Sequence, residues 1–288
     1  LIIYVDDFKL SGPKAEVKKA WEKLRKRLQR SEPAKRRLPG ERFLGCQTHG
    51  YWFKDHTIIE NDMKAFFEQC IEKYLDEVGS NVELKVTCTP FIDEETVTDD
   101  ETNEQGALAD SCSFISMKFL YGARVARWDL LLIIGLLASM VSKRNAACDR
   151  KLYKLVCLAY SSQDPKQCRK VYGDVVSWYI EIQSDADLAN CTFTRRSTLG
   201  VLGPRKGHLT LAPVAASSTK REATPEAELI AASGVERTIG FPLVDLLEKV
   251  LQRPVQSIAK EDNTAMIQVV KKEWSPAMRH MKKVHAVS

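Results

Sequence analysis

The sequence lacks the features of a zinc-binding, disulfide-stapled or membrane-spanning protein. Its eight cysteines are scattered along the chain, and no two of them form the CxxC pair common in zinc sites and redox motifs. This pattern argues against a disulfide scaffold and fits a reducing compartment. The longest apolar run covers residues 130–141 and is too short to span a bilayer. No secretory signal is visible, so we expect a protein that is neither secreted nor membrane-bound.

The chain also lacks an internal repeat and an initiating methionine. It begins with Leu1 inside a predicted strand, which favours a fragment of a longer polypeptide that is cut at both ends. The length of 288 residues corresponds to roughly two domains. A hydrophobic content of 44% and a charged content of 28% are ordinary for a globular chain.

Charge is distributed unevenly along the chain. Residues 14–42 contain 12 basic and 4 acidic residues, and Lys18, Lys19, Arg25 and Arg27 are candidates for binding nucleic acid. Such a block can follow a phosphate backbone, although a solvated helix face explains it equally well. Residues 93–110 contain 8 acidic residues and no basic one, which is typical of a linker or a disordered loop.

Periodicity predicts strands followed by alternating helices and strands, which indicates a layered α/β fold. Helices are expected at residues 13–30, at 61–78 with Asn61 as the N-cap, and at 113–142 with a break near Arg127 or Gly135. Further helices are expected at 146–161, at 225–251 with a break at Gly240 and Pro242, and after residue 263. Strands are expected at 42–47, 175–183, within 200–214 and at 255–260. The apolar stripe of helix 61–78 is interpreted as core.

The first twelve residues, LIIYVDDFKLSG, predict a tight hairpin with Asp6 and Asp7 at its bend. Adjacent carboxylates repel each other and suit hard cations such as magnesium. Aspartate is also a common turn former, so this window alone leaves both interpretations open.

Acidic residues recur where predicted strands end. Asp185 closes one strand, Asp262 follows another, and Glu228 lies in the first two turns of a helix. Carboxylates placed in this way can converge at one end of a sheet and hold two divalent ions. Each also has a structural explanation. Asp185 and Asp187 would be turn formers, Glu226 and Glu228 would complement the helix dipole, and Asp262-Asn263 would cap a helix.

Several sequence boxes occur in an order that resembles a known family. They are YVDD, FLGC, TPF, FLYGARVARWDL, SDADLANCTFTRRSTLG, STKREATPEAELIAAS and EDNTAMI. Together they are similar to the reverse transcriptase and RNase H region of copia-type retrotransposon polyproteins, along nearly the whole chain. The resemblance implies the end of a polymerase palm and part of the thumb at 1–90, and an acidic linker at 91–112. It also implies a helical thumb or connection at 113–170 and an RNase H-like mixed-sheet α/β domain at 171–288.

The same resemblance implies roles for individual residues. Asp6 and Asp7 would bind the polymerase metals, and Asp185, Glu228 and Asp262 would bind magnesium or manganese in the RNase H site. Glu228 is chosen over Glu226 because Glu-Leu-Ile-Ala resembles the family's helix box. Arg195 and Arg196, followed by Ser197, match a box beside that site, on the nucleic-acid side or in a structural role. The implied partners are RNA template, DNA and RNA–DNA hybrid, inside a cytoplasmic particle or the nucleus.

The chain departs from the family pattern at several positions. A third polymerase aspartate and the fingers are absent, so we expect no polymerisation by this fragment. The strand at residues 200–203 is shorter than usual, which would disturb the sheet register. Lys282, two positions after His280, stands where a fourth carboxylate is common in the family. Either Lys282 abolishes the site, or the fourth carboxylate is expected in sequence after Ser288. His285 is either a general acid/base or an incidental surface residue. The alternative function is therefore a catalytically dead retroelement remnant that at most binds nucleic acid. The oligomeric state is left open.

Overall fold

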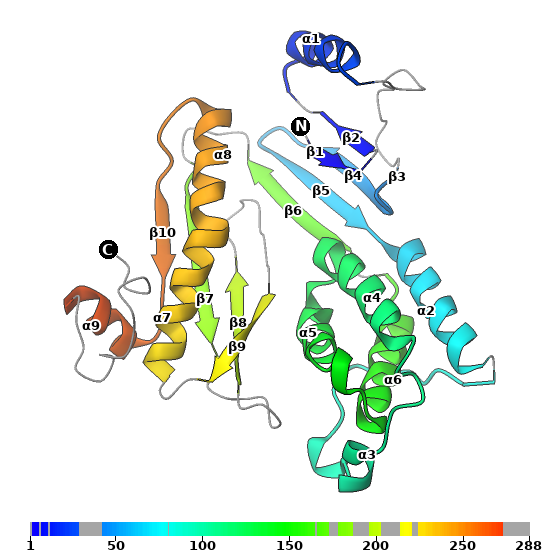
Figure 1. Ribbon diagram of the computed structural model, residues 1–288. Coiled ribbons are helices and arrows are strands. Elements are labelled where there is room, and N and C mark those ends of the chain that lie inside the picture. The colour runs from blue at the N-terminus through cyan, green and yellow to red at the C-terminus, as the bar shows by residue number, and fades with distance from the viewer. Residues whose placement is uncertain are drawn as a thin grey trace.

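The computed structural model is a mixed α/β structure with two larger sheets and a bundle of helices (Figure 1). It describes residues 2–5, 7–10, 12–28, 42–79, 81–164, 166–172, 178–186, 196–202, 214–220 and 224–272. The predicted α/β class is confirmed at this level. Within these residues, no helix is both long and apolar enough to cross a membrane. The cysteines in the described part are free thiols, most of them buried.

The first large sheet is antiparallel and has the order β3-β4-β5-β6. Its strands are β3 (Arg42–Phe43), β4 (Cys46–Trp52), β5 (His56–Asp62) and β6 (Gln167–Tyr172). The prediction of a single strand at 42–47 is wrong, because a turn at Leu44 and Gly45 separates β3 from β4. Both turn residues have positive φ, 52° and 79°, as a two-residue hairpin of the right twist requires. The Tyr121 hydroxyl donates a hydrogen bond of 2.6 Å to the Leu44 carbonyl and so ties the turn to a helix.

β6 was not predicted, because residues 113–170 were expected to be helical. Its pairing with β5 brings together segments about a hundred positions apart, such as Asn61 and Gln167. Lys166, just before β6, makes ion pairs of 2.9 Å with Glu60 and 3.3 Å with Asp62 on β5. The first sheet is therefore completed by a strand that follows all the core helices in the chain.

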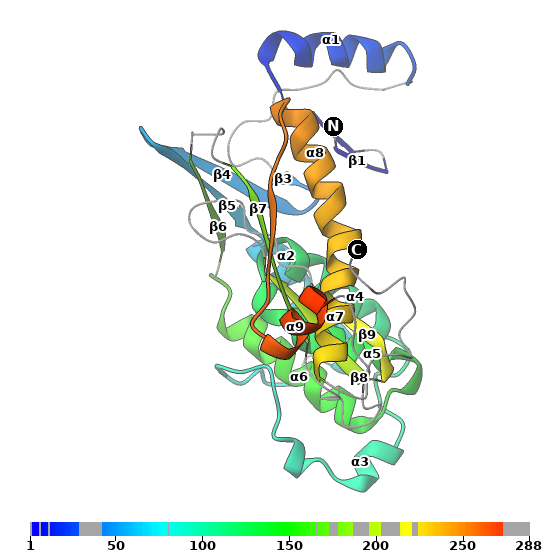
Figure 2. The same ribbon diagram turned by 90° about the vertical axis from the view of Figure 1, so that its left-hand side faces the viewer.

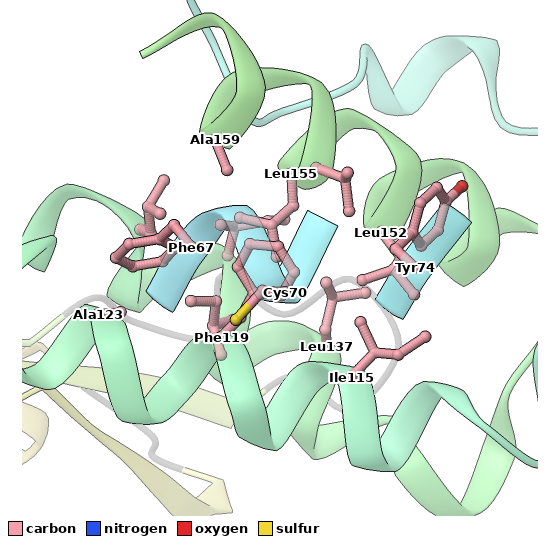
Figure 3. Close-up of a cluster of buried hydrophobic side chains, with 14 of the residues drawn as sticks. Phe67, Cys70, Tyr74, Ile115, Phe119, Ala123, Leu137, Leu152, Leu155 and Ala159 are labelled. Atoms are coloured by element: carbon pink, nitrogen blue, oxygen red, sulfur yellow. The ribbon is translucent and has the colours of Figure 1, made fainter. Parts of the chain in front are cut away.

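The helical core lies against this sheet and consists of α2 (Lys64–Val78), α4 (Cys112–Ala126), α5 (Leu131–Ser139) and α6 (Ala146–Ser161). The predicted stripe of helix 61–78 is confirmed as core, with Phe67, Cys70 and Tyr74 facing side chains from the other helices (Figure 3). The N-cap prediction is wrong. Asn61 lies in β5, where its side chain accepts a hydrogen bond of 3.3 Å from Thr48.

The expected break near Arg127 is confirmed, whereas Gly135 lies inside α5. Arg127 is only 3% exposed, so its charge needs partners. Its guanidinium donates to the Asp129 carboxylate and, at 2.6 Å, to the Ser162 carbonyl at the end of α6. One buried arginine thus joins the break between two helices to the end of a third.

The acidic segment is ordered, so the interpretation of residues 93–110 as a disordered loop is wrong. It forms a 3-10 turn at Glu94–Thr96 and a short helix, α3 (Asp99–Asn103). Thr98 and Glu101 form a reciprocal capping box at the start of α3. Arg150 and Lys151 on α6 pair with Glu101 and Glu94, each at 2.7 Å. Opposite charge on α6 therefore holds the segment in place.

The second large sheet has the order β10-β7-β8-β9, with β7 and β10 parallel and the other pairs antiparallel. Its strands are β7 (Ile180–Ala186), β8 (Arg196–Leu202), β9 (Val214–Lys220) and β10 (Ser257–Lys260). The helices of this half are α7 (Thr224–Val235), α8 (Phe241–Leu251) and α9 (Thr264–Lys272). The expected loss of register at residues 200–203 is not found in the described part of β8. This strand pairs with β7 in regular register, and its pairing with β9 has one irregularity, between Arg196 and Thr198. Gly203 lies outside the described residues.

The predicted break in helix 225–251 is a π-helical turn, Glu236–Gly240, between α7 and α8. Pro242 lies in the first turn of α8, where proline is tolerated. Ile180 and Ile182 of β7 pack with Val235 and with partly buried apolar residues of α8. A Cβ at Gly240 would lie 2.8 Å from the Ile182 side chain, so this glycine permits the close contact between turn and strand.

The N-terminal part forms a small hairpin of β1 (Ile2–Tyr4) and β2 (Asp7–Lys9), followed by helix α1 (Lys14–Arg25). The predicted helix at residues 13–30 is thus confirmed in its first part. Val17, Trp21 and Leu24 form its half-buried side. Figure 2 shows α1 at one end of the molecule, away from the helical core.

Candidate active site

The predicted hairpin at the N-terminus is present, but its bend differs from the prediction. Tyr4 pairs with Asp7, so Asp7 belongs to β2 and not to the bend. Val5 follows β1 with φ of 49° and is 79% exposed, a conformation that is strained for a β-branched residue. Asp6 and the side chain of Asp7 lie outside the described part of the chain. The position of these carboxylates as metal ligands therefore stays a prediction.

The parallel pair β7 and β10 brings two of the predicted acidic residues to one edge of the second sheet. The ladder pairs Ile180 with Ser257 and continues in step to Gln183 with Lys260. The same spacing, carried two residues further, would set Asp262 beside Asp185 at about the 5 Å that separates neighbouring strands. A contact of 3.4 Å between the Ser184 hydroxyl and the Glu261 carboxylate supports this continuation. Asp185 itself is the penultimate residue of β7, and only its backbone is described.

The sequence left open whether Asp262 and Asn263 cap a helix or bind a metal ion. The Asn263 side chain accepts a hydrogen bond of 3.0 Å from the Met266 amide and so caps α9. Glu261 accepts one of 3.0 Å from the Asn263 amide. Asp262 lies between them and is exposed. The capping explanation therefore applies to Asn263 and leaves the Asp262 carboxylate at the end of the strand available to a ligand.

Helix α7 packs against β7 and carries both candidate glutamates near its start. Glu226 is 6% exposed and Glu228 is 4% exposed, so burial does not decide between them. Burial of a carboxylate is costly and requires a compensating polar or cationic neighbour. The burial of Glu226 and Glu228 therefore weakens the explanation that they only complement the helix dipole, because an exposed side chain would serve that role as well.

The donor set of Asp185, Glu228 and Asp262 consists of carboxylate oxygens, the ligands that magnesium and manganese prefer. Among the described side chains, no three of histidine, cysteine, aspartate and glutamate lie close enough to hold a metal ion. That set does not include the side chain of Asp185. By residue type the three positions suit a divalent metal ion, whereas the strand register concerns only Asp185 and Asp262.

The predicted nucleic-acid-binding residues lie on separate elements. Lys18, Lys19 and Arg25 are exposed on α1, and Arg27 is exposed just beyond its end. Lys19 also makes an ion pair of 2.8 Å with Glu16. Arg196 opens β8 in the other half of the chain, with its side chain outside the described set. The structure thus gives a basic helix rather than one joined patch.

Some predicted positions lie outside the described residues. These are Asp187, Arg195, His280, Lys282 and His285.

Sequence reasoning also missed a buried ion pair beside the candidate site. Glu181 on β7 is 3% exposed, and its carboxylate lies 2.8 Å from the Lys260 ammonium on β10. A glutamate between two isoleucines in a strand was the available signal, because a buried carboxylate requires a partner. The pair links the two parallel strands close to the ends that carry Asp185 and Asp262.

Comparisons with protein-family models, with curated proteins and with solved structures found no match to this chain.

Proposed function

We propose that the chain is part of a retrotransposon reverse transcriptase and RNase H, and that its second half hydrolyses RNA in RNA–DNA hybrids. The observation that carries the proposal is the parallel pairing of β7 with β10, whose register would set Asp185 beside Asp262. The chain order of the second half is three strands, two successive helices joined by a π-helical turn, a strand and a helix. This order supports the RNase H-like domain that the sequence boxes imply. Glu228 would complete the site from α7, which packs on β7.

In this proposal Asp185, Glu228 and Asp262 hold magnesium or manganese at the edge of the sheet. Two such ions, when bound, would hold the attacking water and the leaving oxygen of a phosphodiester. Asp185 would contribute a carboxylate from the end of β7, and Asp262 one from two residues beyond the end of β10. Glu228 contributes a carboxylate from a buried position, where bulk water competes less for it.

The substrate would be recognised through its backbone and its A-form-like shape, because a ribonuclease of this kind must accept any sequence. The first half, with Asp6 and Asp7 on the N-terminal hairpin, would belong to the polymerase that copies RNA into DNA in the parent polyprotein. The proposed location is intracellular, in a cytoplasmic particle or the nucleus, where RNA template and DNA are both present.

The test is cleavage of a labelled RNA–DNA hybrid by the full chain with magnesium or manganese. We expect Asp185→Asn and Asp262→Asn to abolish cleavage, because each keeps its shape but loses the charge that holds the metal. Asp245→Asn, an exposed position on α8, is the matched control and should cleave as the unaltered chain does.

A second measurement separates a folded, inactive remnant from a failed preparation. A working metal site should raise the free energy of unfolding by about 2.7 kcal/mol at a metal concentration one hundred times Kd. If the chain unfolds cooperatively but shows neither cleavage nor metal stabilisation, the remnant becomes the better description. The sequence feature that favours this alternative is Lys282, which stands in place of a fourth carboxylate.

A further inference from the structure

The β4–β5 hairpin ends in three consecutive aromatic residues that remain accessible to solvent. Tyr51, Trp52 and Phe53 are 46%, 70% and 55% exposed. In Figure 2 this end of the hairpin extends outward from the first sheet, on the side away from α8. Residues 51–56 are called the hairpin tip below. A concentration of exposed aromatic surface of this kind marks an interaction site more often than an incidental feature.

Two of these aromatic residues share one face of the hairpin with a histidine. Phe53 and His56 stack with ring centroids 4.6 Å apart and planes 11° from parallel. The Phe53 amide donates a hydrogen bond of 2.9 Å to the His56 carbonyl, which fixes the backbone across the turn. Tyr51 lies two residues before Phe53 and therefore on the same face of the strand. The Phe53 ring is thus held in place before any partner binds, which reduces the entropy lost on binding.

Trp52 lies on the opposite face. A Cβ at Gly50 would be 2.8 Å from its indole ring, so the ring rests flat across the glycine. The tip consequently presents aromatic surface on both sides, with the stacked pair on one side only.

Positive charge flanks the face that carries Tyr51 and Phe53. Tyr51 pairs with Ile58 and Ile58 with Lys170, so the exposed lysine lies on the same face two strands away, at about 10 Å. Lys54 is exposed in the turn itself. A nearby acid is Asp55, whose carboxylate bonds to the His56 ring at 2.7 Å, and this bond lowers the Asp55 pKa. The aromatic face is therefore bordered by Lys54 and Lys170. Two carboxylates lie near it, and both have partners: Asp55 is bound to the His56 ring, and Glu60, two residues from Ile58 on the same face, pairs with Lys166 at 2.9 Å.

We propose that the hairpin tip binds single-stranded nucleic acid, with bases stacking on Tyr51 and Phe53 and phosphates attracted by Lys54 and Lys170. Exposed rings beside lysines are the combination used by proteins that bind single strands without sequence preference, because every base has a face that stacks. A protein partner would more typically be met by a larger apolar patch with fewer bordering charges. The inference rests on the proposed function in one respect, that the chain acts on nucleic acid, and it adds a binding surface in the other half of the chain.

The test is binding of fluorescein-labelled oligo(dT) and oligo(U) to the full chain, followed by anisotropy in EDTA so that no cleavage occurs. We expect Tyr51→Ala and Phe53→Ala each to weaken binding about tenfold, within the range found for loss of one stacked base. Tyr51→Phe and Phe53→Tyr keep a ring and should bind as the unaltered chain does. Lys170→Gln should reduce the slope of log K against log salt concentration by about 1.

Phe114→Ala is the matched control, because Phe114 on α4 is 57% exposed, close to the value for Phe53. Equal loss of binding in this control, or unchanged binding by a folded Phe53→Ala chain, would overturn the inference. So would self-association of the chain that disappears in Phe53→Ala, since the tip would then bind a second copy. Absence of any binding to either oligonucleotide would have the same meaning.

The hybrid-cleavage assay on the same preparations distinguishes the two proposals. Metal-dependent cleavage together with aromatic-independent binding rejects only the role of the hairpin tip. Aromatic-dependent binding without metal-dependent cleavage rejects only the proposed nuclease.

Discussion

Two glycines in the helical core have opposite surroundings. A Cβ on Gly122 of α4 would lie 2.9 Å from the ring of Phe67 and 3.0 Å from the ring of Phe66. A Cβ on Gly135 of α5 would meet nothing within 4 Å. Both residues are helical, so the same substitution separates the effect of packing from that of helix propensity.

We expect Gly122→Ala to lower the free energy of unfolding by about 1–3 kcal/mol, because the added methyl group overpacks two aromatic rings. Gly135→Ala should raise it by up to about 1 kcal/mol, because alanine loses less backbone entropy in a helix. Urea unfolding followed by circular dichroism measures both changes. Shifts of the same sign in the two variants would contradict this account.

Single residues also show where prediction from the sequence fails. Asn61 precedes an amphipathic helix and has the chemistry of a cap, yet strand pairing places it opposite Thr48 in β5. A cap preference is local, whereas the partner of Asn61 is thirteen residues away. By contrast, Asn263 was predicted with Asp262 as a capping pair, and it does cap α9, because its role depends only on the next few residues.

At the scale of elements, helices were predicted better than strands. α6 has the predicted bounds, since its pattern and its Asn145 cap are local. β6 was missed because its identity as a strand depends on β5. The acidic segment was misinterpreted although a signal was present. Thr98 and Glu101 have the spacing of a capping box, and the basic residues that bind the segment lie some fifty positions away on α6.

The pKa of Glu101 is lowered by its ion pair with Arg150 and by the capping bond to Thr98. A lowered folded-state pKa means that the stabilisation is present above the unfolded value, near 4.5, and is lost as pH falls through the folded value. We expect α3 to detach from α6 below about pH 4.5, before the helical core unfolds. Hydrogen exchange measured by mass spectrometry, corrected for intrinsic rates, should show earlier exchange in residues 94–104.

Glu101→Gln supplies the test at neutral pH, because it removes the charge and keeps the length of the side chain. After correction for intrinsic rates, hydrogen exchange in α3 should then be fast at pH 7 and should change little with pH. Glu104→Gln changes an exposed acid at the end of the same helix and should leave exchange slow at pH 7. Slow exchange in both variants would show that the ion pair does not hold the segment.

At the scale of the whole molecule, the order of the parts implied by the sequence boxes stays a prediction. The expected boundary at residues 170 and 171 falls inside β6, which completes the first sheet. The strand order β10-β7-β8-β9 was also not predicted, because a period-two pattern does not name a strand's neighbour.

We expect a fragment of residues 1–172 to be monomeric and to unfold cooperatively. A fragment of residues 1–166 lacks β6, so the edge of β5 is exposed and should promote aggregation. Size-exclusion chromatography and urea unfolding compare the two directly. Equal behaviour of the two fragments would mean that β6 contributes little to the first sheet.

The place of β6 has a consequence for synthesis on the ribosome. Lys166, which precedes β6, is 106 residues later in the chain than its partner Glu60. At a translation rate of about 5–20 residues per second, β6 is synthesised roughly 5–20 s after β5. During this interval the nascent chain carries an unpaired strand edge that a chaperone or another nascent chain can occupy. Slow codons placed between the two strands would lengthen this exposure, and fast ones would shorten it.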